Sequence, residues 1–186
     1  MLLIGSTGRK SGKTTLVCQI IRKFRKKNII AIKVSTIEKA DKDFHHDLPA
    51  TSKKGFCLTE ETRTNTKKDT SKMLAVGDSR VFWLRAEKKC LRKGWALLLK
   101  TIGRDAVCIC ESNSLRQIVR PGLFIMVKGP RCRKIKPSAK EVLNFADRII
   151  SPDDNGFDNF LRDLRLISEK WSITTKCESL QNRDSQ

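Results

Sequence analysis

Several residue types are missing or scarce in this chain of 186 residues. It contains no tyrosine and only two histidines, and its 20 acidic residues are outnumbered by 39 lysines and arginines. The net charge of +19 attracts anions, so the candidate partners are nucleotides, nucleic acid or an acidic protein surface. Aromatic residues make up only 6%, and none lies within the basic run at 128–136. This scarcity disfavours a stacking platform for single-stranded nucleic acid.

Long apolar runs are also absent. The run at 1–4 is too short for a signal peptide, and no later run approaches the roughly 20 apolar residues that cross a bilayer. The seven cysteines are an odd number, and several lie within apolar runs. Buried, reduced thiols are therefore a simpler account than a disulfide framework. We expect a cytoplasmic protein without a membrane partner.

The order of apolar patterns predicts one α/β domain over 1–172, followed by a polar tail at 173–186. Short apolar runs predict strands, and the segments between them carry helical spacing, as in the amphipathic pattern that starts at Thr14. Such alternation favours a mainly parallel sheet with helices on both faces, with its ligand at the carboxyl ends of the strands. The predicted strands are 1–6, 28–36, 79–86, 105–111 and 122–129, and a further one ends the segment 138–151.

Two other segments differ from this alternation. Residues 37–68 are almost wholly polar and much longer than an ordinary connection, so we expect a flexible flap or insert there. The segment 157–171 is amphipathic throughout.

The stretch "GRKSGKTT" at 8–15 carries the most specific chemistry. A phosphate-binding loop needs backbone N–H groups turned inward, a helix N-terminus, a lysine for the β- and γ-phosphates and a hydroxyl for Mg²⁺. Gly12, Lys13 and Thr14 meet the last three needs, directly after an apolar strand and directly before an amphipathic helix. The predicted nucleotide-binding residues are Gly8, Arg9, Lys10, Ser11, Gly12, Lys13, Thr14 and Thr15.

One position departs from this motif. Thr7 stands five residues before Gly12, where the loop normally has its first glycine. Because a β-branched residue resists positive φ, the loop closes only if Thr7 lies in the β or α region. We expect Gly5 and Gly8 to provide the tight turn. The alternative is a glycine turn that binds nothing.

An acidic residue at the end of a later apolar strand would complete a Mg²⁺ site. Glu111 follows the apolar run "AVCIC" and fits this position, although it could also be an ordinary surface carboxylate. Asp69, at the start of a short helix, is a second candidate that could instead only cap that helix. The predicted metal ligands are therefore Thr14, Glu111 and Asp69, and the predicted catalytic residues are Lys13 and Glu111.

Taken together, these residues resemble the MobB family of accessory proteins in molybdopterin-guanine dinucleotide biosynthesis. The similarity lies in four blocks: "GRKSGKTTL" at 8–16, "IAIKVS" at 30–35, "KKDTSKMLAVGDSRVFWLR" at 67–85 and "DAVCICESNS" at 105–114. The resemblance implies a Rossmann-like P-loop NTPase fold that binds GTP with Mg²⁺ and hydrolyses it weakly. It also implies a homodimer and a partner enzyme, the molybdenum cofactor guanylyltransferase.

Three questions stay open at the level of sequence. No Asn-Lys-X-Asp motif for guanine is present, so GTP rather than ATP comes from the resemblance alone. The basic run at 128–136 fits a phosphorylated pterin, RNA or simple solvation. The alternative functions are a small-molecule kinase of the same fold and a non-catalytic polyanion or nucleic-acid binder.

Overall fold

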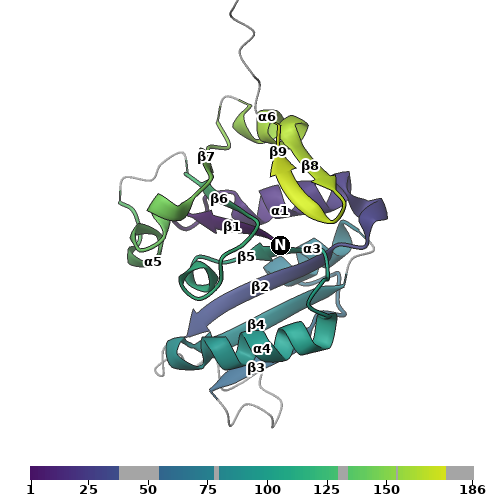
Figure 1. The fold of residues 1–186 in the computed structure, drawn as a ribbon, viewed down its shortest axis with the longest axis vertical. Coiled ribbons are helices and arrows are strands. Elements are labelled where there is room, and N and C mark those ends of the chain that lie inside the picture. Colours follow the sequence, from purple (N-terminus) through teal and green to yellow (C-terminus); the bar gives the residue numbers. More distant parts are fainter. Residues whose placement is uncertain (38–54, 78–79, 130–133, 154, 175–186) are drawn as a thin grey trace, which may run out of the picture.

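A seven-stranded sheet forms the centre of the molecule (Figure 1). The computed structural model describes residues 1–37, 55–77, 80–129, 134–153 and 155–174. The strand order is β3-β4-β2-β5-β1-β6-β7, and every neighbouring pair is parallel except β3 with β4. The predicted α/β class with a mainly parallel sheet is confirmed. The strands are β1 Leu2–Ser6, β2 Ile30–Ile37, β3 Phe56–Glu60, β4 Val81–Glu87, β5 Cys108–Glu111, β6 Leu123–Val127 and β7 Arg148–Ile150.

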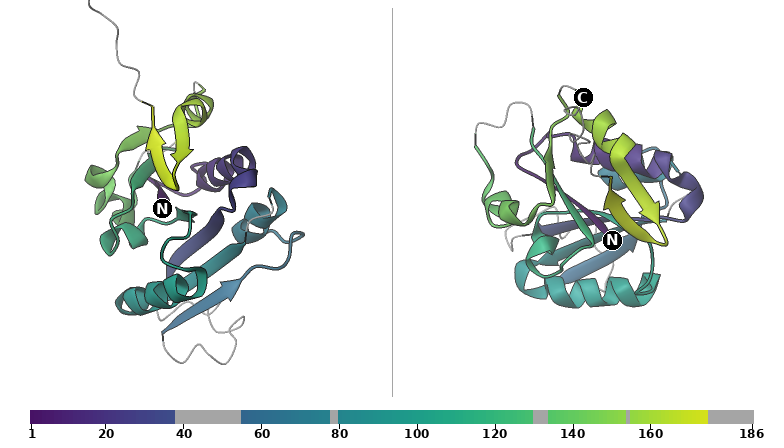
Figure 2. Two further views of the ribbon diagram at one scale, coloured as in Figure 1. Left: turned by 45° about the vertical axis from the view of Figure 1, so that its right-hand side comes forward. Right: turned by 45° about the horizontal axis from the view of Figure 1, so that its top comes forward.

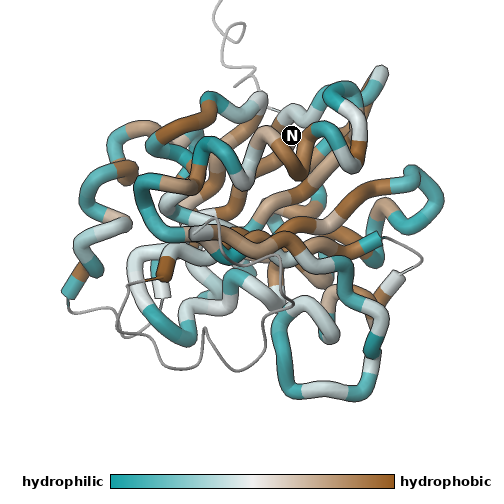
Figure 3. Tube along the Cα trace, turned by 90° about the horizontal axis from the view of Figure 1, so that it is seen from below, coloured by the Kyte–Doolittle hydropathy of each residue, from teal (hydrophilic) through white to brown (hydrophobic). Residues whose placement is uncertain are grey.

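Helices pack against both faces of this sheet (Figure 2). Side chains alternate along each strand, so that in β1 Leu2 and Ile4 enter one core cluster and Leu3 enters the other. The first cluster receives α1 (Lys13–Lys23), α3 (Asp69–Ala75) and α6 (Gly156–Asp163). The second receives α4 (Leu91–Ile102) and Val142, which follows α5 (Pro137–Lys140). The apolar strands consequently run through the middle of the molecule, with hydrophilic segments at its rim (Figure 3).

The structure contains two features that the sequence analysis did not predict. Strand β3 lies inside the segment 37–68, where it forms an antiparallel edge of the sheet. The amphipathic segment 157–171 is helical only to Asp163, and a hairpin of β8 (Leu164–Ile167) and β9 (Lys170–Ile173) follows. This hairpin packs beside α1 through an edge-to-face contact of Trp171 with Phe24. Residues 38–54 of the expected flap, and 175–186 of the expected tail, lie outside the described part of the chain.

Two predictions from composition can be compared with the structure. Among the described cysteines, Cys57, Cys108 and Cys110 are buried, as expected, whereas Cys18 and Cys90 are only partly buried. In the described ranges, no helix combines the length and apolar character needed to cross a membrane.

Candidate functional site

The loop after β1 leads directly into the N-terminus of α1. The first hydrogen bond of the helix runs from the Leu16 N–H to the Gly12 carbonyl at 2.9 Å. The N–H groups at 13–15 therefore take no part in the hydrogen bonds within the helix. The aligned peptide dipoles give this end of the helix a partial positive charge. Strands β1, β5 and β6 are parallel neighbours, and their carboxyl ends therefore meet at the same edge of the sheet. This edge is suited to binding an anion.

The tight turn of the loop lies at Lys10 and Gly12. Both residues have a left-handed backbone, with φ of 53° and 90°. Gly5 lies within β1, so the expectation that it makes the turn was wrong, whereas Gly8 lies in the bend just before Lys10. A Cβ on Gly12 would also meet the Phe157 ring at 3.1 Å. Gly5 is required for a different reason, because a Cβ there would meet the Asn113 Oδ1 at 2.9 Å. The space at these two glycines is therefore limited by α6 on one side and by the segment just after β5 on the other.

Thr7 is buried and hydrogen-bonded, and its backbone is not strained. It is 3% exposed, and its backbone is not in the left-handed region. Its N–H donates to the Val127 carbonyl at 3.0 Å, and its carbonyl accepts from the Lys136 N–H at 3.0 Å. Its hydroxyl accepts from the Gly129 N–H at 3.4 Å. The residue that replaces the first motif glycine therefore ties the loop to the end of β6 and to the segment after it.

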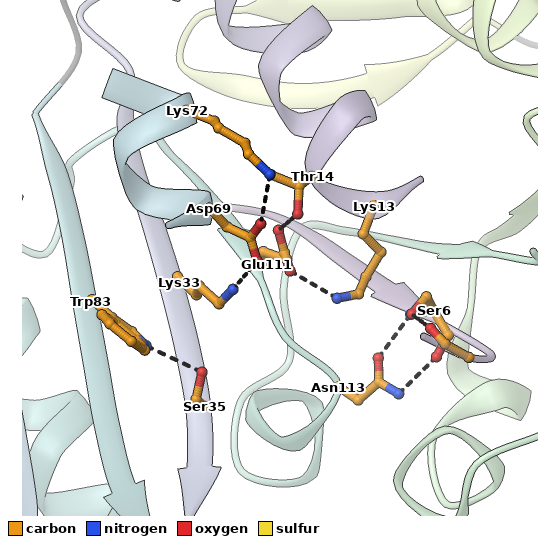
Figure 4. Close-up of polar contacts among 11 residues, drawn as sticks. Ser6, Lys13, Thr14, Lys33, Ser35, Asp69, Lys72, Trp83, Glu111 and Asn113 are labelled. Carbon is orange, nitrogen blue, oxygen red and sulfur yellow. Dashed lines mark hydrogen bonds and ion pairs between the residues drawn. The ribbon is translucent and has the colours of Figure 1, made fainter. Parts of the chain in front are cut away.

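Asn113 holds the base of the loop from the strand beside it (Figure 4). Its Oδ1 accepts from the Ser6 N–H at 2.8 Å, and its Nδ2 donates to the Ser6 carbonyl at 3.0 Å. The side chain therefore satisfies both backbone groups of a fully buried residue. The sequence analysis did not select Asn113, although it lies two residues after Glu111 and within the block "DAVCICESNS" at 105–114.

Glu111, at the end of β5, contacts the predicted phosphate-binding lysine and the predicted metal-binding hydroxyl. Its Oε1 accepts from the Lys13 ammonium at 2.8 Å, and its Oε2 accepts from the Thr14 hydroxyl at 2.7 Å (Figure 4). Glu111 is only 4% exposed, whereas Lys13 is 18% exposed. The structure thus gives Glu111 specific partners in the loop, which an ordinary surface carboxylate would lack.

Asp69 lies on the other side of Glu111, at the start of α3. Its two carboxylate oxygens contact the ammonium groups of Lys33, from β2, and Lys72 (Figure 4). Burial raises the pKa of Asp69, but the hydrogen bond and charge of Lys33 and the charges of Lys72 and Lys13 bring it below the ordinary value. Asp69 is therefore held as a carboxylate. Lys68 is the N-cap of α3, and Asp69 is an acidic residue in the first turn, where the helix dipole also stabilises a carboxylate.

A cleft of about 510 Å³ lies over these groups. Its volume is within the usual range for a site that takes a small molecule. Cations outnumber carboxylates along its wall by five to two, counting Arg9, Lys10, Lys13, Lys72 and Lys136 against Asp69 and Glu111. The lining residues are Gly8, Arg9, Lys10, Ser11, Gly12, Lys13, Thr14, Thr15, Asp69, Lys72, Glu111 and Lys136.

The cleft contains every residue of the sequence-predicted site. The structure adds Lys72 and Lys136, and it makes Lys33 a neighbour through Asp69. Lys136 belongs to the basic run at 128–136, and only that run hinted at it. Burial and the charge of Lys13 lower the pKa of Lys136, the charge of Glu111 opposes this shift, and the charge of Arg9 adds to it.

No known protein family, curated protein or solved structure matches this chain.

Replacing Asn113 by alanine should destabilise the protein. The substitution leaves the N–H and the carbonyl of Ser6 buried without partners, and we expect a loss of about 2 to 4 kcal/mol in the free energy of unfolding. Chemical denaturation measures this loss. Asn159→Ala, which removes a surface contact with Arg162, is the matched control and should change stability by less than about 0.5 kcal/mol. Equal effects of the two substitutions would contradict this role for Asn113.

Proposed function

We propose that this chain is a Mg²⁺-dependent nucleotide-binding protein with a Rossmann-like P-loop NTPase fold. One observation carries the proposal: Lys13 and Thr14 at a helix N-terminus meet Glu111 from a neighbouring strand in a cleft of positive charge. A phosphate chain requires N–H groups, a lysine and a metal-binding hydroxyl at one point. If the loop were a glycine turn that binds nothing, the five cations that line the cleft would have no explanation.

The biological role that we propose is a GTP-binding accessory protein of molybdenum cofactor biosynthesis. The choice of GTP over ATP and the partner enzyme, a molybdenum cofactor guanylyltransferase, rest on the sequence resemblance described above. The proposed homodimer rests on the same resemblance. The positions that carry the resemblance, "GRKSGKTTL" at 8–16 and "DAVCICESNS" at 105–114, include Lys13, Glu111 and Asn113. Cytoplasmic location belongs to the same proposal.

The residues present fit Mg²⁺. Mg²⁺ prefers oxygen ligands and usually takes only one or two from protein, with phosphate and water completing its shell. Thr14 Oγ1 and Glu111 Oε2 are two such oxygens, 2.7 Å apart and at the cleft. When bound, the ion would neutralise charge that develops on the phosphates. Asp69 remains a further predicted ligand, although its oxygens already contact Lys33 and Lys72.

The side chains of the cleft have separable roles in this proposal. Glu111 holds Lys13 and Thr14 in position before a nucleotide arrives, and it gives up these partners when phosphate oxygens replace it. Lys13 and the N–H groups at 13–15 then bind the phosphate chain, and Glu111 turns to the water around the metal. Asp69 stays paired with Lys33 and Lys72, and Glu111 is directed to the water around the metal, so neither carboxylate is left as a general base for an attacking water. Hydrolysis should accordingly be slow without a partner.

The direct test of the proposal is equilibrium binding to the Lys13→Ala variant. The ammonium group would make charge-assisted contacts to the β- and γ-phosphates, and its loss should weaken binding of Mg·GTP and Mg·ATP about ten- to a hundredfold. Isothermal titration calorimetry at moderate salt measures this change. Lys26→Ala removes the same charge from an exposed position after α1 and should leave binding unchanged.

Two controls separate folding and rival functions from the expected result. Lys13→Gln can still donate a hydrogen bond to Glu111, so reduced binding by a folded Lys13→Gln protein assigns the loss to the phosphate contact. Equal, strongly salt-dependent losses in Lys13→Ala and Lys26→Ala would contradict the proposal and support a non-catalytic polyanion binder. Transfer of phosphate from nucleotide to an added acceptor would instead support the small-molecule kinase.

Replacing Glu111 by glutamine should change nucleotide affinity in opposite directions with and without Mg²⁺. Without the ion, removing a negative charge beside the phosphate site and a competitor for Lys13 should strengthen binding about fivefold, or roughly 1 kcal/mol. With the ion, losing a carboxylate that supports it should weaken binding by a similar factor. Calorimetric titrations with Mg²⁺ and with EDTA measure both values. Glu141→Gln, at an exposed position on another part of the surface, is the control; a shift of the same sign in both conditions would contradict the metal role of Glu111.

Nucleotide binding should take up protons at alkaline pH through Lys136. The lowered pKa of Lys136 means that part of this group is neutral there, and a nearby phosphate anion raises the pKa again. Affinity should therefore fall as pH rises through the pKa of the free protein. Calorimetry in two buffers of different ionisation enthalpy measures the proton uptake, which Lys136→Gln should abolish. Identical uptake in the variant and the wild type would assign the protons to another group.

A further inference from the structure

A polar face of the sheet lies beside the nucleotide cleft. On β2 and β4, Ile32, Val34, Phe82 and Leu84 enter the core cluster under α4. The residues between them, Lys33, Ser35, Trp83 and Arg85, therefore project to the opposite face, where Figure 4 shows Trp83, Ser35 and Lys33 leading toward Asp69 and Glu111. Parallel strands inside a sheet are normally apolar on both faces. Polar side chains at these positions require an explanation other than packing.

Arg85 is the least expected of these residues. It is 7% exposed, and its Nε has no hydrogen-bond partner. Its contacts are the Cys57 Sγ at 3.7 Å and the face of the Trp83 ring, whose centroid is 4.5 Å from the guanidinium carbon. Within the described ranges no carboxylate pairs with Arg85, and Glu87, the next residue on this face of β4, pairs with Lys89. A guanidinium group in such surroundings is costly without an anion.

The neighbours of Arg85 hold its guanidinium in a fixed orientation. The Trp83 indole N–H donates to the Ser35 hydroxyl at 3.2 Å, which fixes the ring on which the guanidinium stacks. A stacked guanidinium keeps its N–H groups in its own plane, where they can form a paired contact with two oxygens of a carboxylate or phosphate. The arrangement is prepared for an oxyanion.

The register of the strands places this group within reach of the nucleotide. Glu111 pairs with Lys33 across β5 and β2, Lys33 pairs with Trp83 across β2 and β4, and Arg85 follows two residues later. Two strand spacings of ~4.8 Å and two residues of ~3.3 Å put the Cα atoms of Glu111 and Arg85 roughly 12 Å apart. A small molecule anchored at Arg85 can therefore extend toward the cleft, where Asp69 and Lys72 lie.

We propose that Arg85 anchors a second ligand subsite, which binds the carboxylate or phosphate group of a small acidic molecule beside the nucleotide. That this molecule is a second substrate rests on the proposed function, whereas the oxyanion subsite itself does not. The subsite consists of Arg85, Trp83 and Ser35, with Lys33 on the side of the cleft. Carboxylate and phosphate share the chemistry of two oxygens in one plane, and the experiment distinguishes them.

The test uses the full chain and the indole N–H signal of Trp83 in nuclear magnetic resonance spectra. The chain has three tryptophans, and Trp83→Phe identifies the signal. Inorganic phosphate and malonate are titrated separately at constant ionic strength. At least one of them should shift the signal saturably, and the stronger of the two identifies the anion class. Arg85→Gln should raise the half-saturating concentration about tenfold or more.

Three further variants control the measurement. Arg92→Gln, which removes an exposed cation from α4, should leave the titration unchanged. So should Lys13→Gln, which can still donate to Glu111, because the phosphate loop is a separate site. Arg85→Lys keeps the charge without the planar fork and should weaken binding several-fold, so it replaces Arg85→Gln if that variant does not fold. The proposal is overturned if neither anion shifts the signal, if the response is the same in both Arg85 variants as in the wild type, or if a folded Lys13→Gln protein loses it. Loss of nucleotide binding with an intact Trp83 response would overturn only the proposed function.

Discussion

A carboxylate that is almost wholly removed from water must be paired, and Glu111 meets this requirement with the two residues that begin α1. Because its oxygens contact Lys13 and Thr14 at 2.8 and 2.7 Å, the end of β5 and the N-terminus of α1 are held together. Removing Lys13 would leave the buried charge of Glu111 uncompensated, which is far costlier than losing a surface ion pair. This contact sets how the start of α1 meets the end of β5 and which groups the cleft presents to a ligand.

The surroundings of this contact prepare the cleft for an anion before any anion is bound. Asn113 satisfies the backbone of Ser6, and Thr7 joins the loop to the chain beyond β6, so the loop geometry is fixed by buried hydrogen bonds. The five cations that line the cleft exceed its carboxylates. A ligand that brings negative charge relieves their mutual repulsion and does not have to order the loop. In the proposed nucleotide site, the affinity comes from groups that the fold has already placed.

The sequence predicted those parts of the site that depend on local order along the chain. The run from Gly8 to Thr15 is contiguous, and Glu111 could be found because parallel strands end at one edge of a sheet. Lys33, Lys72 and Lys136 could not be selected among 39 lysines and arginines, since only the tertiary fold brings them to the cleft. Strand β3 was not predicted because it lies inside the long polar segment 37–68. The hairpin turn at Ser168 and Glu169 has positive φ at both residues without the glycine or asparagine that usually marks such a turn.

A crystal structure with Mg²⁺ and a non-hydrolysable GTP analogue tests the central claim most directly. The account predicts that the β- and γ-phosphates contact the N–H groups at 13–15 and the Lys13 ammonium, that Thr14 Oγ1 joins the metal shell, and that the Lys13 to Glu111 ion pair is replaced. A nucleotide bound elsewhere, with Lys13 and Thr14 still on Glu111, would contradict it. In that case the cleft would be a polar feature of the fold, and its assignment as the nucleotide site would have to be abandoned.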